Sequence, residues 1–285
     1  MFGSKVELKS DKEIALMRKA GLVSRAALEA ARSVLVPGVT TAEVDAASAQ
    51  AIADAGATSN FLGYYGYPAT VCVSVNEEIV HGIPGDRVIR EGDLVSIDGG
   101  AIVDGWHGDN AFTTLVGDGG DTADQRLSDV TEESMWAGIA AFASAKRVGD
   151  VGVAIEDYIM DVAPDLSIVE DFTGHGIGTQ MHMEPEVLNY GAKNRGPRVR
   201  PGMVICIEPI VVRGNQANTT LDDEWTVVTN DGSRAAHWEN TVAMHQNGIW
   251  VLTEPDGGEA RLAPYGVTPV PVSYTHLTLP TKRIV

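Results

Sequence analysis

The chain has 285 residues, and its formal net charge is −18 because 39 acidic residues outnumber 21 basic ones. This charge excludes a protein that coats a phosphate backbone, and a hydrophobic content of 44% excludes a disordered chain. No apolar run is long enough to span a bilayer and only two cysteines are present, so we expect a cytoplasmic protein without a disulfide framework or membrane contact.

Two helices are predicted near the N-terminus. Residues 10–13 (SDKE) and 40–43 (TTAE) each form a capping box, in which a hydroxyl residue is followed three positions later by Glu. Small and apolar residues recur at helical spacing after the first box, and Pro37-Gly38 ends that helix. The second helix is expected to end at Gly56.

Strands follow these helices. Residues 70–75 alternate in polarity around Cys72, which predicts a half-buried strand. Residues 93–103 and 107–116 are two strand-like runs joined by Asp104-Gly105, a dipeptide typical of tight turns. The pattern therefore predicts a β-hairpin.

The second half of the chain repeats this order. Helices are predicted at residues 122–145 and 151–162, and strands at residues 203–212, 225–229 and 238–245. Runs of helices separated from runs of strands favour the α+β class, with helices packed on an antiparallel sheet.

We expect one domain over residues 1–271, with halves at about 10–120 and 121–255. Residues 272–285 (VSYTHLTLPTKRIV) read like translated adapter sequence, and we interpret them as a non-native tail. A native tail is the alternative interpretation, and it would also lie outside the core.

Acidic side chains inside apolar strand runs are the main functional signal. Asp98 and Asp109 fall nearly opposite each other across the predicted hairpin, Glu208 ends the run VICIE, and Glu239 lies in WENTV. His175 stands between two glycines. A carboxylate in such a run must be paired, protonated or bound to metal, because burying it alone is very costly. The chain has few basic residues in these segments.

Two divalent cations would balance the four carboxylates in charge. Carboxylates can bridge two ions, and a water held between the ions becomes a nucleophile at neutral pH. One imidazole with four carboxylates is a donor set rich in oxygen, which favours Mn²⁺, Fe²⁺ or Co²⁺ over a thiolate-type zinc site. The pattern leaves the choice among Mn, Fe, Co and Zn open.

Eight short motifs occur along the chain in a fixed order. They are FLGYYGYP (61–68), VNEEIVHGIP (75–84), SID (96–98), WHGD (106–109), GHGIG (174–178), HMEP (182–185), IEP (207–209) and WE (238–239). In this order and spacing they resemble the type I methionine aminopeptidases, metallopeptidases of the pita-bread fold. The resemblance covers about residues 10–253.

The resemblance implies roles for the five residues singled out above. It implies that Asp98 binds one metal ion and that Asp109 and Glu239 bridge both ions. His175 and Glu208 would complete the second ion, and Glu208 would also carry the proton during peptide hydrolysis.

The resemblance also implies a substrate site. His81 and His182 would hydrogen-bond the peptide and steady the tetrahedral intermediate. Aromatic, thioether and thiol side chains would form a soft slot for the methionine side chain. These pocket residues are Tyr64, Tyr67, Cys72, Met181 and Trp225.

By resemblance, the chain removes the N-terminal methionine from nascent proteins at the ribosome, acts as a monomer and prefers a small second residue. The 33 residues between His175 and Glu208 (208 − 175) are too few for the insertion that marks type II. The sequence departs from the common pattern at Tyr65, Met181 and Asn240, none of which is an implied metal ligand.

Two alternatives remain. The first is a pita-bread peptidase for Xaa-Pro bonds, whose metal ligands would be the same. The second is a non-catalytic pita-bread protein that only binds its partner. Such relatives lose ligands, whereas all five ligand positions are filled in this chain.

Overall fold

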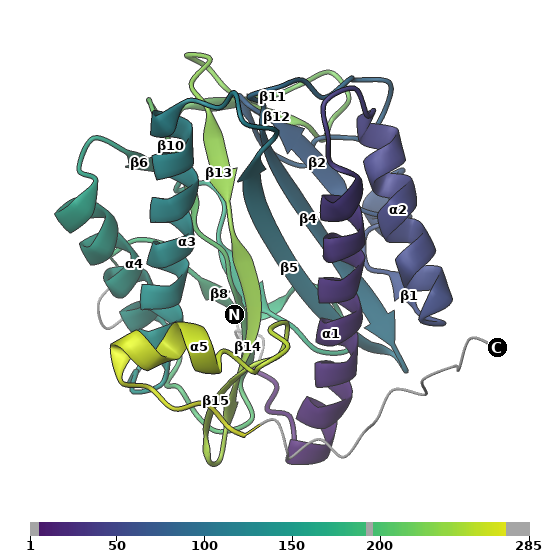
Figure 1. Cartoon of the computed structure of the whole chain (residues 1–285). Helices are drawn as coiled ribbons and strands as arrows, with labels where there is room; N and C mark the ends of the chain where they lie inside the picture. The colour runs from purple at the N-terminus through teal and green to yellow at the C-terminus, as the bar shows by residue number, and fades with distance from the viewer. Residues whose placement is uncertain (1–5, 192–195, 272–285) are drawn as a thin grey trace.

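The computed structural model describes residues 6–191 and 196–271, and its ribbon is drawn in Figure 1. The predicted non-native tail at residues 272–285 lies outside the described residues. Strands β4, β5 and β14 occupy the middle of the view, with α1 and α2 on one side and α3 and α4 on the other. The expected α+β class is confirmed.

The long helices lie where the capping and spacing patterns predicted them. Both hydrogen bonds of each capping box, at Ser10 and at Thr40, are formed. The helices are α1 (Asp11–Val34), α2 (Thr41–Asp54), α3 (Thr122–Phe142), α4 (Gly149–Val162) and α5 (Glu259–Leu262), with 3-10 turns η1 (Tyr64–Gly66) and η2 (Ala263–Tyr265).

In the part of the chain that the structure describes, fifteen strands form three antiparallel sheets. The strands of the nine-stranded sheet are β1 (Thr58–Ser59), β2 (Cys72–Val75), β4 (Leu94–Val103), β5 (Trp106–Leu115), β7 (Gly174–Gly176), β8 (Met183–Val187), β9 (Val204–Ile207), β14 (Glu239–His245) and β15 (Gly248–Val251). The two three-stranded sheets contain β6 (Ser167–Ile168), β10 (Ile210–Val212) and β13 (Ala235–His237), and β3 (Glu78–Val80), β11 (Asn218–Thr220) and β12 (Val227–Thr229).

The main sheet runs in the order β1-β4-β5-β14-β9-β7-β8, with β2 beside β4 and β15 beside β14. Helix α1 packs closely on β4 and β5, because small residues such as Gly21 and Ser24 lie on its buried face. A Cβ on Gly108 of β5 would lie 2.4 Å from the backbone nitrogen of Gly21 in α1. This close approach holds the helix against the hairpin that carries Asp98 and Asp109.

The predicted hairpin is confirmed as β4 and β5. Asp104 and Gly105 have φ values of 52° and 79°, the left-handed pair that a tight two-residue turn needs. Asp98 pairs with Ala111 and Asp109 with Gly100. The two carboxylates are therefore offset by two residues along the hairpin, on the same face of the sheet.

The predicted single strand at residues 203–212 is wrong, since the chain leaves one sheet and enters another at Pro209. β9 pairs with β14 in the main sheet, whereas β10 pairs with β13 in a small sheet. Proline has no N–H to continue a ladder, so the pairing opens there. Ile207 lies opposite Asn240 and Ile210 opposite His237, so one register runs through both segments.

The strand predicted at residues 70–75 is confirmed as β2, but it is fully buried instead of half-buried. All four residues of β2 are buried, because both faces of this strand are covered. Val73 and Val75 pack in a cluster that includes Leu28, whereas Cys72 packs with Tyr67 in another. Both cysteines are free, as expected. Within the described residues, none of the helices combines the length and apolar character that a bilayer crossing requires.

Candidate metal centre

Every site residue predicted from the sequence lines one cavity of about 210 Å³. Carboxylates and imidazoles gather at one end of this cavity, and aromatic and sulfur-containing side chains at the other. The cavity is therefore a polar reaction site joined to an apolar slot.

The carboxylates share a row across the main sheet. Cys72 lies opposite Asp98, Asp98 opposite Ala111, and Ala111 opposite Glu239. Paired residues point to the same face of a sheet, so this row faces the cavity. The register of β9 and β14 places Glu208 opposite Glu239 in turn. Ala111, with only a methyl group, leaves the middle of the row open.

One oxygen of each predicted ligand carboxylate is buried without a hydrogen-bond partner. These atoms are Oδ1 of Asp98 and Asp109 and Oε1 of Glu208 and Glu239. Unpaired buried oxygens of this kind are costly in an apolar site. Burial raises the pKa of Asp98 to about 7 and that of Glu208 to about 8. Burial, with repulsion from neighbouring carboxylates, raises the pKa of Asp109 and Glu239 well above the usual range.

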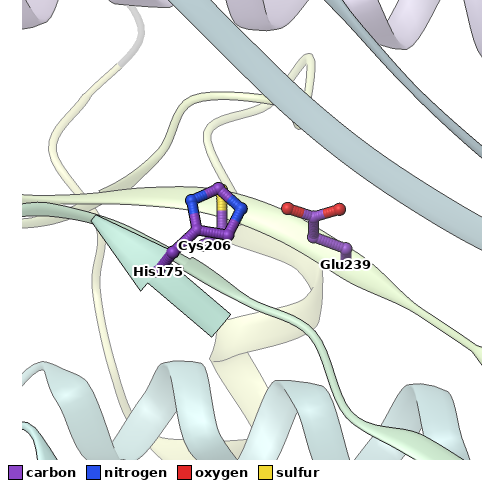
Figure 2. Close-up of side chains that lie close together, drawn as sticks. All are labelled: His175, Cys206 and Glu239. Atoms are coloured by element: carbon purple, nitrogen blue, oxygen red, sulfur yellow. The ribbon is translucent and has the colours of Figure 1, made fainter. Parts of the chain in front are cut away.

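Among the described residues, three groups of donor atoms lie close enough to hold a metal ion, and each contains Glu239. One group joins it to Asp98 and Asp109, and a second joins it to Glu208 and His237. The third group, drawn in Figure 2, joins it to His175 and Cys206. Glu239 is therefore the shared member of the whole centre.

The glycines around His175 allow two backbones to approach. A Cβ on Gly174 would lie 2.3 Å from the carbonyl oxygen of Cys206, and one on Gly176 would lie 2.2 Å from that of Glu184. The His175 Nδ1 atom is 3.0 Å from the Gly176 carbonyl oxygen, which can only accept a hydrogen bond. Nδ1 therefore carries the proton, and the lone pair of Nε2 is free to bind a cation.

The chain matches the model of metallopeptidase family M24 over residues 15–246. This chain belongs to metallopeptidase family M24. It is 47% identical over 253 residues to "Methionine aminopeptidase 1" of Mycobacterium tuberculosis, covering 87% of this chain and 95% of the relative. It is also 42% identical to the protein of the same name from Bacillus subtilis, and the match covers 86% of this chain and 98% of that relative. The expected resemblance to methionine aminopeptidases is confirmed.

Solved structures agree with the family. The crystal structure of a methionine aminopeptidase from Thermotoga maritima superposes with a TM-score of 0.84 at 38% identity, covering 88% of this chain and all of that chain. The expected pita-bread fold is confirmed. M24 peptidases are metal-dependent hydrolases, so divalent metal binding follows from family membership. The four unpaired carboxylate oxygens and the Nε2 lone pair of His175 fit such ions.

His81 and His182, the other two predicted histidines of this M24 site, also line the cavity. Burial lowers the pKa of His81 to about 4 and that of His175 to about 3, so both imidazoles are neutral. The rings of His175 and His182 lie 4.3 Å apart. The Tyr64 hydroxyl lies 2.7 Å from His182 Nδ1, which holds that ring and leaves its Nε2 for other partners.

Tyr64→Phe should lower kcat/KM for a methionyl peptide about tenfold, because an imidazole that loses its orienting hydrogen bond is less well placed. The free energy of unfolding should change by less than about 1 kcal/mol, since this hydrogen bond is solvent-exposed. Steady-state kinetics and urea unfolding measure the two effects. Tyr65→Phe is the matched control, because Tyr65 is 85% exposed. Equal losses in the two variants would contradict the role of Tyr64.

The apolar end is a cluster of buried side chains around Tyr67. Its ring packs edge-on against Trp225 at 5.0 Å, and its hydroxyl lies 3.1 Å from the Gly82 carbonyl oxygen. Cys72 and Met181 complete the cluster with Phe61. The predicted pocket residues therefore lie together.

Six residues of the cavity were missed by the sequence analysis. Five are apolar or small and carry no sequence signal that separates them from core residues. One of the five, Phe172, packs on the ring of His81. His237 is different, because it is a polar residue two positions before Glu239 in a buried strand. The rule that found the carboxylates could have found it. The six are Phe61, Val80, Phe172, Thr173, Ile210 and His237.

Proposed function

We propose that this chain is a methionine aminopeptidase, which hydrolyses the first peptide bond of polypeptides that begin with methionine. The observation that supports this function is the joining of four unpaired carboxylate oxygens to a narrow apolar slot in one cavity. An exopeptidase needs both parts, because the side chain must be held while the adjacent bond is attacked.

Two ions would be held by five residues. These residues are Asp98, Asp109, His175, Glu208 and Glu239, whose carboxylate oxygens and imidazole nitrogen would serve as the ligands. The oxygen-rich donor set favours Mn²⁺, Fe²⁺ or Co²⁺, with Zn²⁺ as a further candidate. When bound, such ions lower the pKa of water and polarise the peptide carbonyl.

The side chains of the chain itself would move protons and orient the peptide. Glu208 accepts a proton from the attacking water and passes it to the leaving amine, because its carboxylate lies at the polar end of the cavity. His81 and His182, whose pKa values are both lowered by burial, would hydrogen-bond the peptide and steady the tetrahedral intermediate. Tyr67, Cys72 and Trp225 surround the methionine side chain.

The substrates would be nascent polypeptides with a small second residue, met at the ribosome by a cytoplasmic monomer. The size preference is proposed because the cavity, at about 210 Å³, is small and must hold the methionine side chain as well as the bond to be cut.

A peptide panel tests this function. With Mn²⁺ or Co²⁺ added, the purified chain should release methionine from Met-Ala peptides and leave Ala-Pro peptides intact. Release should fall at least tenfold when the second residue is changed from Ala to Phe or Lys. Cleavage of Ala-Pro alone would favour the Xaa-Pro peptidase. An absence of release with every metal would favour the binding protein.

A further inference from the structure

His237 faces the metal centre from a strand outside the main sheet. It is the last residue of β13, its side chain is 2% exposed, and it lines the cavity. Its backbone N–H donates to the Thr113 hydroxyl and its carbonyl accepts from the same hydroxyl, both at 2.8 Å. This double contact with β5 fixes the direction in which the imidazole points.

The imidazole Nε2 has no hydrogen-bond partner, although it is buried. Its nearest charged neighbour is Glu208 Oε2, at 3.6 Å. This distance is too long for a hydrogen bond, and an unpaired buried N–H is costly. A shift of about 0.7 Å would bring the two atoms to hydrogen-bonding distance, and contacts of this kind often tighten when a site is loaded.

The two oxygens of Glu208 have different surroundings. Oε1 is buried and unpaired, and it lies 3.4 Å from His175 Nε2, the atom free to bind a cation. Oε2 faces His237 instead. Oε1 is therefore the oxygen on the side of the ions, and Oε2 is the outer oxygen.

We propose that His237 is a positioning residue, which donates its Nε2–H to the outer oxygen of Glu208 and so directs the other oxygen toward the metal. This inference rests on the metal centre proposed above. Carboxylates that bind metal are themselves held by hydrogen bonds, and loss of such a partner lowers metal affinity about 10- to 100-fold. Glu208 has no Lys or Arg ion pair among the described residues, so His237 is suited to this task.

Metal binding without peptide tests the proposal. Calorimetric titration of Mn²⁺ into chelator-treated protein should show affinity about 10- to 100-fold weaker in His237→Leu than in wild type. His237→Gln keeps an N–H donor of similar reach, and it should bind within about threefold of wild type. His245→Leu, which removes a buried histidine from the same chain outside the cavity, should also leave Mn²⁺ affinity unchanged.

A double-mutant cycle with Glu208→Ala shows whether His237 acts through Glu208. In the Glu208→Ala background, His237→Leu should cause no further loss, because the carboxylate to be positioned is gone. Wild-type affinity in His237→Leu would overturn the proposal. Equal loss in His237→Gln and His237→Leu would overturn it too, since it would make the imidazole itself a metal ligand. Because no peptide is present, failure here is distinct from failure of methionine release.

Discussion

Glu239→Gln should lower kcat/KM for a Met-Ala peptide by about 1,000-fold or more, even with excess Mn²⁺. All three groups of donor atoms in the cavity include Glu239, so this single change weakens every way of holding an ion. The amide keeps the shape of the side chain but has no charge, and it offers one oxygen where the carboxylate offers two. We expect bound metal to fall below one ion per chain, as measured by elemental analysis.

The same substitution, Glu239→Gln, should stabilise the metal-free fold. Without ions, Glu239 is 3% exposed and lies among other carboxylates that raise its pKa. Burial and these neighbours force the carboxyl group to stay protonated, which costs stability at neutral pH, so Glu239→Gln should unfold at a higher temperature than wild type in EDTA. Glu186→Gln is the matched control, because Glu186 is exposed on β8. Activity within tenfold of wild type would contradict the shared role of Glu239.

Chelated protein should lose stability as the pH rises from about 7 to about 8. This window is above the range in which buried histidines such as His81 and His175, with their lowered pKa values, would oppose this trend. Asp98 and Glu208 have folded-state pKa values of about 7 and about 8, both raised by burial. The folded chain therefore binds more protons than the unfolded chain in this window, and its free energy of unfolding falls with increasing pH. The expected slope is about 1 to 3 kcal/mol per pH unit, since each retained proton contributes about 1.4. Urea unfolding in EDTA measures it.

Metal loading should reverse this slope. Metal ions compete with protons for the same carboxylate oxygens, so metal binding strengthens as the pH rises. Because the ions bind the folded chain, the free energy of unfolding then rises as well. Asp165 and Asp231, whose pKa values are lowered to about 2, affect stability only below about pH 4 and do not disturb the window. Glu208→Gln should flatten the slope of the chelated protein. A metal-free stability that rises between pH 7 and 8 would contradict this prediction.

Local features of the fold were predictable because they depend on neighbouring residues. The capping boxes at Ser10 and Thr40 and the turn at Asp104-Gly105 involve atoms only a few positions apart. The short strand β7 was missed, because Gly174–Gly176 has no length for a pattern and is a strand only through β8 and β9. The change of sheet at Pro209 was missed for a similar reason, since residues 203–212 are almost uniformly apolar.

The candidate site was more visible in the sequence than the topology. Carboxylates such as Asp98 stand out in a strand of Val and Ile, because burial without a partner is so costly there. Their convergence on one cavity could not be read from spacing alone, because Glu239 meets Asp98 only through the pairing of both strands with β5. His237 was overlooked although it breaks an apolar strand in the same way.

The unbroken register across Pro209 bears on which changes of length this chain can tolerate. Glu208 and Glu239 oppose each other because the pairs on both sides of them, Ile207 with Asn240 and Ile210 with His237, are in step. Inserting or deleting one residue in either strand would turn a carboxylate to the other face of the sheet. Natural variants of this ribbon should therefore differ by substitution, and differences in length should be confined to the turns that connect β10, β11, β12 and β13.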